Sequence, residues 1–165
     1  MPNIGAVIRN KNNQVLKGEQ NLPPPCNCIP GQCPVDGKCG TQGVIYQATV
    51  ETRNGEKFKY VGLSGGSFIT RFQKHSSSFR IHDPRNSTTL SKKVLELQRN
   101  HILFDITWKI LQVASPYRVC SRQYSLCSLE IYYILYQPSE ASLNSRQEIA
   151  NKCRHQNKFK LSNIK

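Results

Sequence analysis

Six residues of this 165-residue chain are of types that together can cleave a phosphodiester bond. In chain order they are Tyr46, Tyr60, Arg71, His75, Glu130 and Asn144. Hydrolysis of a phosphodiester needs a cation for the charge that develops at phosphorus, a base for water and a group that stabilises the leaving oxygen. An arginine, a tyrosine or histidine, and a carboxylate that holds a divalent metal meet these three needs.

Each of these residues also has an ordinary structural explanation. Glu130 is the only charged residue in an apolar stretch, and a buried carboxylate is costly unless it is paired or bound to a metal. A salt bridge, for example with Arg71, satisfies that carboxylate without any catalysis. Tyrosines commonly pack in strands, and a histidine on a basic helix face is usually solvated. The combination, rather than any single residue, favours chemistry.

A second group of residues suits a metal ion. Four cysteines, Cys26, Cys28, Cys33 and Cys39, stand close together in a segment that also contains prolines and glycines. Tight turns of this kind can bring four soft ligands around a tetrahedral zinc ion. The spacing departs from the common C-x2-C pattern, so a pair of disulfides and free thiols remain alternatives. The chain has seven cysteines, an odd number that does not allow complete internal pairing.

Further candidate ligands stand in the C-terminal half. They are Cys127, Cys153 and His155, with Cys120 as a possible fourth member. Cys127 also fits as a small apolar residue inside a helix. The sequence does not decide whether these residues form a second site or complete the site that the N-terminal cysteines begin.

The two tyrosines belong to segments that predict a β-hairpin. Residues 44–50 and 57–63 are rich in β-formers, and Asn54-Gly55 lies between them. An Asn-Gly pair between two apolar runs predicts a type I′ turn, because both residues tolerate positive φ. We therefore expect the tyrosines on neighbouring antiparallel strands, followed by a loop over residues 64–67.

Helices and one further strand follow the hairpin. Ser67 is a candidate N-cap for a helix on which Arg71 and His75, four residues apart, share a face. A second helix is expected over residues 89–99. Residues 104–113 alternate between apolar and polar types, which predicts a half-buried strand. A third, largely buried helix is expected from about residue 122 to 136, ended by Pro138.

The charge of the chain indicates a polyanionic partner. Lys and Arg total 23 against 10 Asp and Glu, a formal charge of +13. Such an excess favours nucleic acid, with a basic secreted factor as the alternative. Candidate contacts to DNA are Lys74, Arg80, Lys92, Lys93, Arg146, Arg154 and Lys158. The longest apolar run is too short for a membrane span, and no signal peptide is evident, so we expect an intracellular location, nuclear or cytoplasmic.

The order of these residues resembles the GIY-YIG nuclease superfamily over about residues 43–146. Val44-Ile45-Tyr46 is similar to the first motif and Tyr60-Val61-Gly62 to the second. Val44 replaces the first glycine, and Gly43 stands one place earlier. A narrower resemblance, to the endonuclease domain of Penelope-like retroelements, extends over nearly the whole chain. It is carried by residues 33–39, 46–50 and 143–146, by Cys153-Arg154-His155 and by Lys158-Phe159.

The resemblance implies an α/β fold, with a small mixed or antiparallel three-stranded sheet flanked by helices. It divides the chain into a lead-in or linker at 1–25, a Cys-rich zinc-binding segment at 26–40 and a GIY-YIG-like nuclease domain at 41–165 with a basic C-terminal tail. Retroelement endonuclease domains follow a reverse transcriptase, which implies that the chain is part of, or derives from, a longer polyprotein.

The resemblance also implies roles. Tyr46 would deprotonate or orient water, supported by Tyr60 and His75, and Arg71 would bind the scissile phosphate. Glu130 would hold one Mg²⁺ or Mn²⁺ at the leaving 3′-oxygen, and Asn144 would brace the site. The products would carry 3′-hydroxyl and 5′-phosphate ends, and such a nick can prime reverse transcription at the target. If His75 acts in its neutral form, activity should rise through about pH 6.5.

Three other functions fit parts of the sequence. A structure-specific DNA repair nuclease of the same superfamily would use the same residues on flaps or branches. A basic, zinc-containing DNA-binding module would need no catalysis. A secreted disulfide protein is the third alternative, and the state of the thiols distinguishes it from the others.

Overall fold

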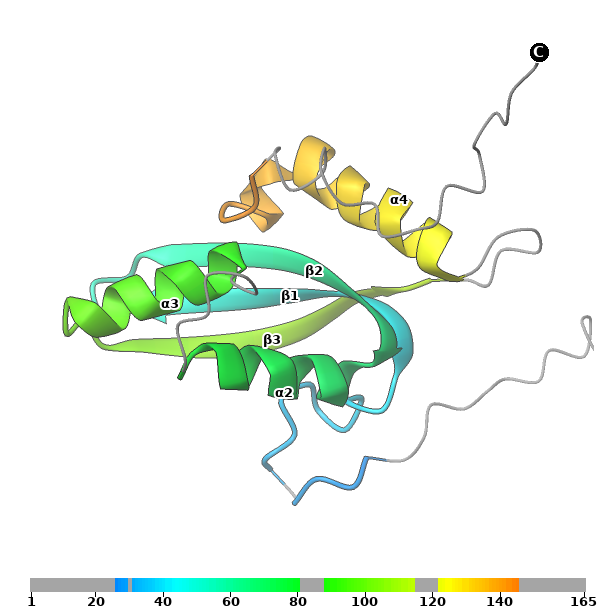
Figure 1. The fold of residues 1–165 in the computed structure, drawn as a ribbon, viewed down its shortest axis with the longest axis horizontal. Coiled ribbons are helices and arrows are strands. Elements are labelled where there is room, and N and C mark those ends of the chain that lie inside the picture. The colour runs from blue at the N-terminus through cyan, green and yellow to red at the C-terminus, as the bar shows by residue number, and fades with distance from the viewer. Residues whose placement is uncertain (1–25, 30, 81–87, 115–121, 146–165) are drawn as a thin grey trace, which may run out of the picture.

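The sheet at the centre of the molecule has three antiparallel strands in the order β2-β1-β3, with three helices around it (Figure 1). The computed structural model describes residues 26–29, 31–80, 88–114 and 122–145. The elements are β1 (Gln42–Thr52), β2 (Lys57–Ser67), α2 (Phe68–Ser78), α3 (Thr89–Arg99), β3 (Phe104–Val113), α4 (Arg122–Tyr136) and a 3-10 turn, η1 (Pro138–Glu140). The expected α/β class is confirmed, and the sheet is antiparallel rather than mixed.

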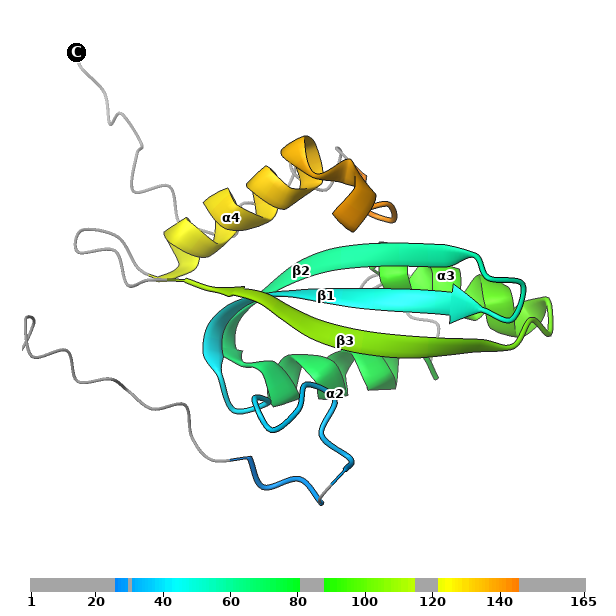
Figure 2. The same ribbon diagram turned by 180° about the vertical axis from the view of Figure 1, so that it is seen from behind.

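The two sides of the sheet are covered by different helices, α2 and α3 on one side and α4 on the other (Figures 1 and 2). Alternate residues of β1 make this possible, because successive side chains of a strand point to opposite faces. Tyr46 and Ala48 pack with α2, α3 and the Cys-rich segment. Ile45 packs with Leu126 and Ile134 of α4. The candidate catalytic tyrosine therefore lies in the α2–α3 layer.

The predicted hairpin is present, but its turn differs from the expected one. Within the turn only Gly55 has a positive φ, 84°, whereas a type I′ turn needs two such residues. The Gly55 N–H donates to the Thr52 carbonyl at 2.9 Å, and the Thr52 N–H donates to the Glu56 carbonyl at 3.0 Å. The strands are thus joined by a longer loop that places a single glycine in the left-handed region.

The segment over residues 64–67 is the end of β2 and not a loop, which corrects the sequence expectation. Ser64 pairs with Val44, and Ser67 pairs with Gln42 after a register irregularity. Glycines are poor strand formers, so the local composition argues against a strand there. Pairing with the well-formed β1 overrides that local preference.

The start of α2 is satisfied by the Cys-rich segment. Ser67 makes no side-chain cap, contrary to expectation, and its hydroxyl lies 2.9 Å from that of Thr70. Instead the Phe68 N–H donates to the Thr41 carbonyl at 3.0 Å, and the Ile69 N–H donates to the Cys39 carbonyl at 2.8 Å. Two of the free N–H groups at the helix start are therefore bound by the residues that end the cysteine segment.

Helix α4 is only partly buried, which corrects the expectation of a largely buried helix. Leu126 and Ile134 are buried, whereas Tyr132, Leu135 and Tyr136 are exposed. The apolar composition of α4 suggested more burial than the structure shows. A helix that packs against the sheet with one side buries only the apolar stripe on that side. No helix in the described part of the chain combines the length and apolar character that a membrane span requires.

Candidate active site and metal centre

Three of the six candidate residues form a hydrogen-bonded cluster between β1 and α2. The Tyr46 hydroxyl lies 2.7 Å from Nε2 of His75. The Arg71 Nε–H donates to the same hydroxyl at 3.1 Å. Strand β1 supplies the phenol, and consecutive turns of α2 supply the guanidinium and the imidazole, as the i, i+4 spacing predicts. Tyr46 and His75 are buried, while Arg71 is partly exposed.

Aromatic rings enclose His75 on several sides. The ring centroid of Trp108 lies 5.5 Å from that of His75, and those of Tyr46 and Tyr60 lie at 5.8 Å and 5.9 Å. Phe79 stacks on the imidazole at 6.2 Å. The cluster is therefore a small polar network in a mostly apolar surrounding, where unpaired polar groups are costly and hydrogen bonds are strong.

This surrounding shifts the pKa values of the cluster. Burial lowers the pKa of His75 to about 3, and the charge of Arg71 adds to the effect. Burial raises the pKa of Tyr46 to about 12, although Arg71 acts in the opposite direction. Burial alone would lower the pKa of Arg71, but the Tyr46 and Tyr60 phenols outweigh it, and the net direction is upward. At neutral pH the imidazole and the phenol are both uncharged, and the guanidinium carries the positive charge.

The expected rise of activity through pH 6.5 therefore does not follow for His75. With a pKa of about 3, the imidazole is already neutral throughout the range from pH 5.5 upward. The sequence expectation used the ordinary pKa of a solvated histidine. It could not include the burial of His75 beneath the rings of β1, β2 and β3.

Steric contact with Tyr46 explains why the Tyr60-Val61-Gly62 motif ends in a glycine. Gly62 pairs with Tyr46 across the strands. A Cβ at Gly62 would lie 2.5 Å from the Tyr46 hydroxyl and 2.7 Å from Cζ of the same ring. The phenol occupies the space that any other residue would fill, so this glycine sets the position of the hydroxyl.

Tyr60 lies on the same face of the sheet as Tyr46, and the residue that pairs with it, Ala48, is small. Ala48 pairs with Tyr60 on one side and with Trp108 on the other. Its small side chain leaves room for both rings to lie against His75. Tyr60 also acts on the pKa of Arg71 through a side-chain hydrogen bond. Tyr60 is therefore part of the cluster, at the side of the guanidinium.

Glu130 comes from α4, the helix on the opposite side of the sheet. Glu130 is half-buried, whereas the sequence predicted a carboxylate inside a largely buried helix. Its charge contributes to the raised pKa of Tyr46, after the larger effects of burial and Arg71. The carboxylate is thus coupled electrostatically to the cluster.

Asn144 binds the free edge of β2. Its Oδ1 accepts from the Val61 N–H at 2.8 Å, and its Nδ2 donates to the Val61 carbonyl at 2.9 Å. The Leu143 N–H donates to the Lys59 carbonyl at 2.8 Å, and the Ser142 hydroxyl accepts from the Lys59 N–H at 2.9 Å. These bonds replace the missing neighbour strand next to Tyr60 and Gly62. Through these bonds Asn144 supports the strand that carries the second motif.

The turn before Asn144 is anchored by an acidic residue. Glu140 accepts from Gln47 at 2.8 Å and forms an ion pair with Lys59 at 2.9 Å. These two partners lower the pKa of Glu140, the Gln47 hydrogen bond first. Glu140 and its contact with Gln47 were not predicted from the sequence, because the contact joins segments that are far apart in the chain.

The candidate DNA contacts differ in availability. Lys74 and Arg80, in and just after α2, and Lys92 of α3 are exposed. Lys93 is instead engaged, with Nζ 2.9 Å from Glu96 and 4.3 Å from the Phe58 ring centroid. Arg146, Arg154 and Lys158 lie outside the described residues.

The four N-terminal cysteines form a cluster that can bind a metal ion. The sulfur atoms of Cys26, Cys28, Cys33 and Cys39 all lie within 4.8 Å of one another. Two of these separations are 3.3 Å and 3.6 Å. A disulfide requires about 2.0 Å, and all four residues are free thiols. Sulfur ligands around one tetrahedral zinc ion are roughly 3.8 Å apart, given a Zn–S distance of about 2.3 Å.

Backbone amides favour the thiolate of Cys33. Burial by itself would raise its pKa, but hydrogen bonds from the backbone at Val35 and Gly37 outweigh burial and lower the pKa to about 7. Burial and the neighbouring thiols raise the pKa of Cys39. A bound cation would instead lower the pKa values of the thiols that coordinate it, because a coordinating thiol loses its proton.

The second proposed group of ligands is not assembled in the described residues. Cys127 is half-buried on α4, and its proposed partners Cys153, His155 and Cys120 lie outside the described ranges. Among the described residues, the only cluster of three or more possible ligands is the N-terminal one.

Sequence reasoning missed Trp108, the ring nearest to His75 among those that enclose it. Its strand was predicted, and its inward position follows from the alternation of that strand. Its neighbours depend on the register of β3 against β1, which no local signal gives. In the comparisons with known proteins, no family model, curated protein or solved structure matched this chain.

Proposed function

We propose that the chain is a metal-dependent DNA endonuclease of the GIY-YIG type, leaving 3′-hydroxyl and 5′-phosphate ends. The observation that carries the proposal is the cluster in which the Tyr46 hydroxyl meets both His75 and Arg71. Its members are those that the sequence resemblance nominates. The net charge of +13 supports a nucleic acid as the substrate.

Arg71 is the phosphate ligand in this proposal. It is the member of the hydrogen-bonded trio with exposed surface, so an incoming phosphate meets the guanidinium first. Its planar fork can bind two phosphate oxygens while charge develops on them. Lys74, three residues further along α2, extends the same flank of the helix toward solvent.

Tyr46 and His75 provide a path for the proton of the attacking water. The raised pKa of Tyr46, about 12, disfavours a free phenolate as the base. We therefore assign a relay, in which the Tyr46 oxygen accepts a proton from water while its own proton passes to Nε2 of His75. A bound phosphate would offset the charge of Arg71, and the basicity of the imidazole would then rise.

Glu130 is the proposed ligand of the catalytic Mg²⁺ or Mn²⁺. Magnesium sites commonly use one or two carboxylates together with water and substrate phosphates, so a single half-buried glutamate fits this donor set. When bound, the metal supplies charge stabilisation at the leaving 3′-oxygen. The four N-terminal cysteines hold a separate, structural Zn²⁺ in this proposal.

The biological setting follows from the narrower resemblance alone. A nick with a free 3′-hydroxyl would serve insertion by target-primed reverse transcription, with the chain as part of, or derived from, a reverse-transcriptase polyprotein. A DNA repair nuclease of the same superfamily would use the same site on branched substrates.

A DNA-binding module without catalysis is a second candidate, favoured by one observation. Tyr46 has no exposed surface, and the Asn144 amide bonds the β2 edge through both its oxygen and its nitrogen. Both facts suit a cluster that only stabilises the fold. Cleavage itself separates the two candidates.

The test is a plasmid nicking assay with Mg²⁺ or Mn²⁺, followed by end-labelling of the products. The endonuclease proposal predicts nicks with 3′-hydroxyl and 5′-phosphate ends, and no cleavage when a chelator removes the added metal. Binding without cleavage at any metal concentration would leave the non-catalytic module as the function. A panel of flaps, branches and linear duplexes then distinguishes the repair nuclease from the retroelement enzyme.

A further inference from the structure

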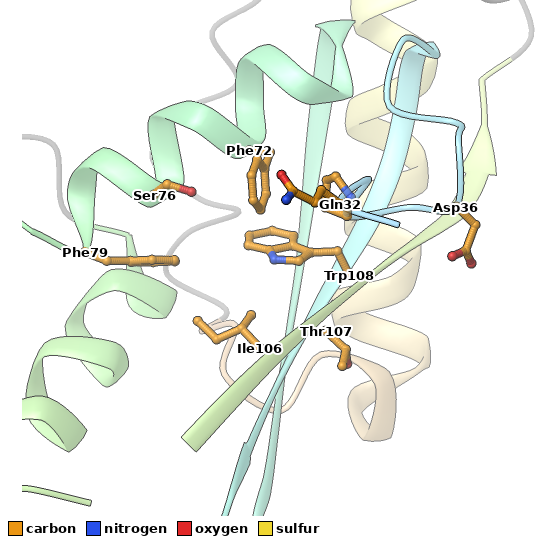
Figure 3. A pocket seen from close by; sticks show the side chains of 9 residues that line it. Gln32, Asp36, Phe72, Ser76, Phe79, Ile106, Thr107 and Trp108 are labelled. Atoms are coloured by element: carbon orange, nitrogen blue, oxygen red, sulfur yellow. The ribbon is translucent and has the colours of Figure 1, made fainter. Parts of the chain in front are cut away.

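An open groove of about 610 Å³ lies between α2, β3 and the Cys-rich segment (Figure 3). Three parts of the chain contribute to it: the Cys-rich segment, α2 with the residue that follows it, and β3. The lining residues that matter here are Gln32, Asp36, Phe72, Ser76, Phe79 and Trp108. This size is typical of pockets that hold a small molecule or one unit of a polymer.

The groove combines aromatic surface with few polar groups. Phe72 packs edge-on against Trp108 at 5.4 Å, and Phe79 presents its ring from the end of α2 (Figure 3). The Gln32 amide points toward these rings, and it offers both a donor and an acceptor. Asp36 also lines the groove, at the end away from the rings, with its carboxylate directed away from them (Figure 3).

The charges in and around the groove suit the base of a nucleotide better than its phosphate. Among the described residues that line the groove there is no Lys or Arg, and the charge of Asp36 would repel a phosphate. Exposed cations are close to the lining residues in the sequence, Arg80 directly after Phe79 and Lys38 in the turn that contains Asp36. A strand of DNA can therefore keep its phosphates on the outer cations while a base enters among the rings.

The groove shares two of its lining residues with the surroundings of the candidate active site. Trp108 lines the groove and also lies 5.5 Å from the His75 ring, centroid to centroid. Phe79 lines it and stacks on the other side of the imidazole. Helix α2 thus presents Arg71 and Lys74 on one flank and Phe72 and Ser76 on the other.

We propose that this groove binds an unstacked nucleobase of the DNA substrate, by stacking on the aromatic rings and by hydrogen bonds to the Gln32 amide. The inference rests on the proposed function for its choice of DNA as the ligand. Stacking on aromatic side chains tolerates every base, and an amide selects among bases by their donors and acceptors. The base must be single-stranded or turned out of the duplex to enter.

Trp108 provides the readout, because it is the only tryptophan of the chain. The full chain is titrated, without divalent metal, with a short single-stranded oligodeoxynucleotide and with an abasic strand of equal length and charge. We expect saturable quenching of Trp108 emission by the first strand only. Equal quenching by the abasic strand, or none by either, would overturn the proposal, and so would quenching only by a neutral, phenylalanine-rich peptide.

A pair of variants tests the position of the base. Ser76→Phe fills the groove and should weaken oligonucleotide binding by about tenfold while abolishing the quenching. Ser77→Phe makes the same change on the exposed side of α2 and should change neither quantity. Circular dichroism establishes that both variants fold, and Gln32→Ala replaces Ser76→Phe if it does not. Wild-type affinity in the folded groove variant would contradict the proposal.

The titration and the nicking assay fail independently. Quenching without nicking would remove the nuclease proposal and leave the groove as a base-binding site. Nicking without quenching would leave the nuclease proposal and remove the groove.

Discussion

Arg71 is the residue on which binding and chemistry converge in this account. Its Nε–H bonds the Tyr46 hydroxyl, and its exposed surface is available to phosphate. A lysine offers a compact charge and no planar fork, so it cannot hold the phenol and two phosphate oxygens in one geometry. The residue should therefore matter more for rate than for affinity.

Arg71→Lys should lower the single-turnover nicking rate by on the order of 10²-fold while changing DNA affinity little. The measurement is a single-turnover time course at saturating enzyme, with affinity taken from filter binding. Arg53→Lys, the same change at an exposed arginine of the hairpin turn, is the control and should cut at the wild-type rate. A full rate in Arg71→Lys would show that the guanidinium geometry is irrelevant.

The low pKa of His75 predicts that the stability of the protein, rather than its cleavage rate, depends on pH. Its pKa is about 3 in the folded state and about 6.5 when unfolded. Between these values the unfolded chain takes up a proton that the folded chain does not. This contribution is fully present above pH 6.5, and stability falls toward pH 3 by up to about 1.4 kcal/mol per pH unit.

Urea denaturation of wild type and His75→Gln from pH 4 to pH 8 measures this dependence. The difference in unfolding free energy between the two should shrink steadily below pH 6.5. His101→Asn changes an exposed histidine with positive φ and should leave the wild-type profile intact. A constant difference across the range would mean that His75 is protonated or solvated in the folded protein.

The meeting of Tyr46, Arg71 and His75 was predictable because both signals are local. A hairpin and an i, i+4 pair on the next helix bring those residues to one face. The use of Asn144 as an edge partner and the enclosure by Trp108 were not predictable, since both depend on contacts between distant segments. The pKa of His75 depends on that same enclosure and was therefore missed with it.

At the level of elements, the site depends on small residues of the central and second strands. Gly62 leaves space for the Tyr46 phenol, and Ala48 leaves space for Tyr60 and Trp108. The alternation of large and small residues across β2, β1 and β3 lets three rings, those of Tyr60, Tyr46 and Trp108, converge on His75. A larger side chain at Gly62 or Ala48 should shift the rings around His75 and lower the nicking rate, even where the sheet still folds.

Gly62→Ala should reduce the nicking rate by tenfold or more, because its Cβ would lie 2.5 Å from the Tyr46 hydroxyl. Overpacking of this kind also costs stability, about 1–3 kcal/mol. Gly66→Ala, on the same strand with nothing within 4 Å of its added Cβ, is the matched control. Nicking rates and urea midpoints of both variants test the claim, and equal rates for the two would refute the steric explanation.

The positions of α3, β3 and α4 were predicted correctly from the sequence, because the apolar pattern of each segment and the proline after α4 delimit them. The capping box that Thr88 and Ser91 form at the start of α3 was not among the predictions. The turn at Gly55 and the strand character of residues 64–67 were predicted wrongly. In both places pairing with β1, rather than local preference, decides the backbone conformation.

Across the whole molecule, the cysteine cluster and the candidate site are joined through α2. Cys39 belongs to the cluster, and its carbonyl accepts the N–H of Ile69 in the first turn of that helix. Val35 and Cys39 are also part of the core that surrounds Tyr46. A metal at the four sulfurs would therefore stabilise the segment that holds the start of α2, the helix that carries Arg71 and His75.

Purified protein should contain about one equivalent of zinc, and Cys33→Ser should lose it. The loss should lower Tm by on the order of 10 °C, since the ligand set folds together with its metal. Cys127→Ser, at a half-buried thiol on α4, should retain the zinc. Elemental analysis and thermal unfolding measure these effects, and a metal-free wild type, or an unchanged Tm after metal removal, would contradict them.

The most direct test of the account is the single-turnover nicking rate of Tyr46→Phe. The change deletes the one oxygen atom that both His75 and Arg71 contact and keeps the ring in the core. The account predicts a rate at least about 10²-fold below wild type, with DNA affinity within about twofold. Tyr132→Phe, on the exposed side of α4, should cut normally. A wild-type rate in Tyr46→Phe would show that the cluster is structural and that any cleavage occurs elsewhere.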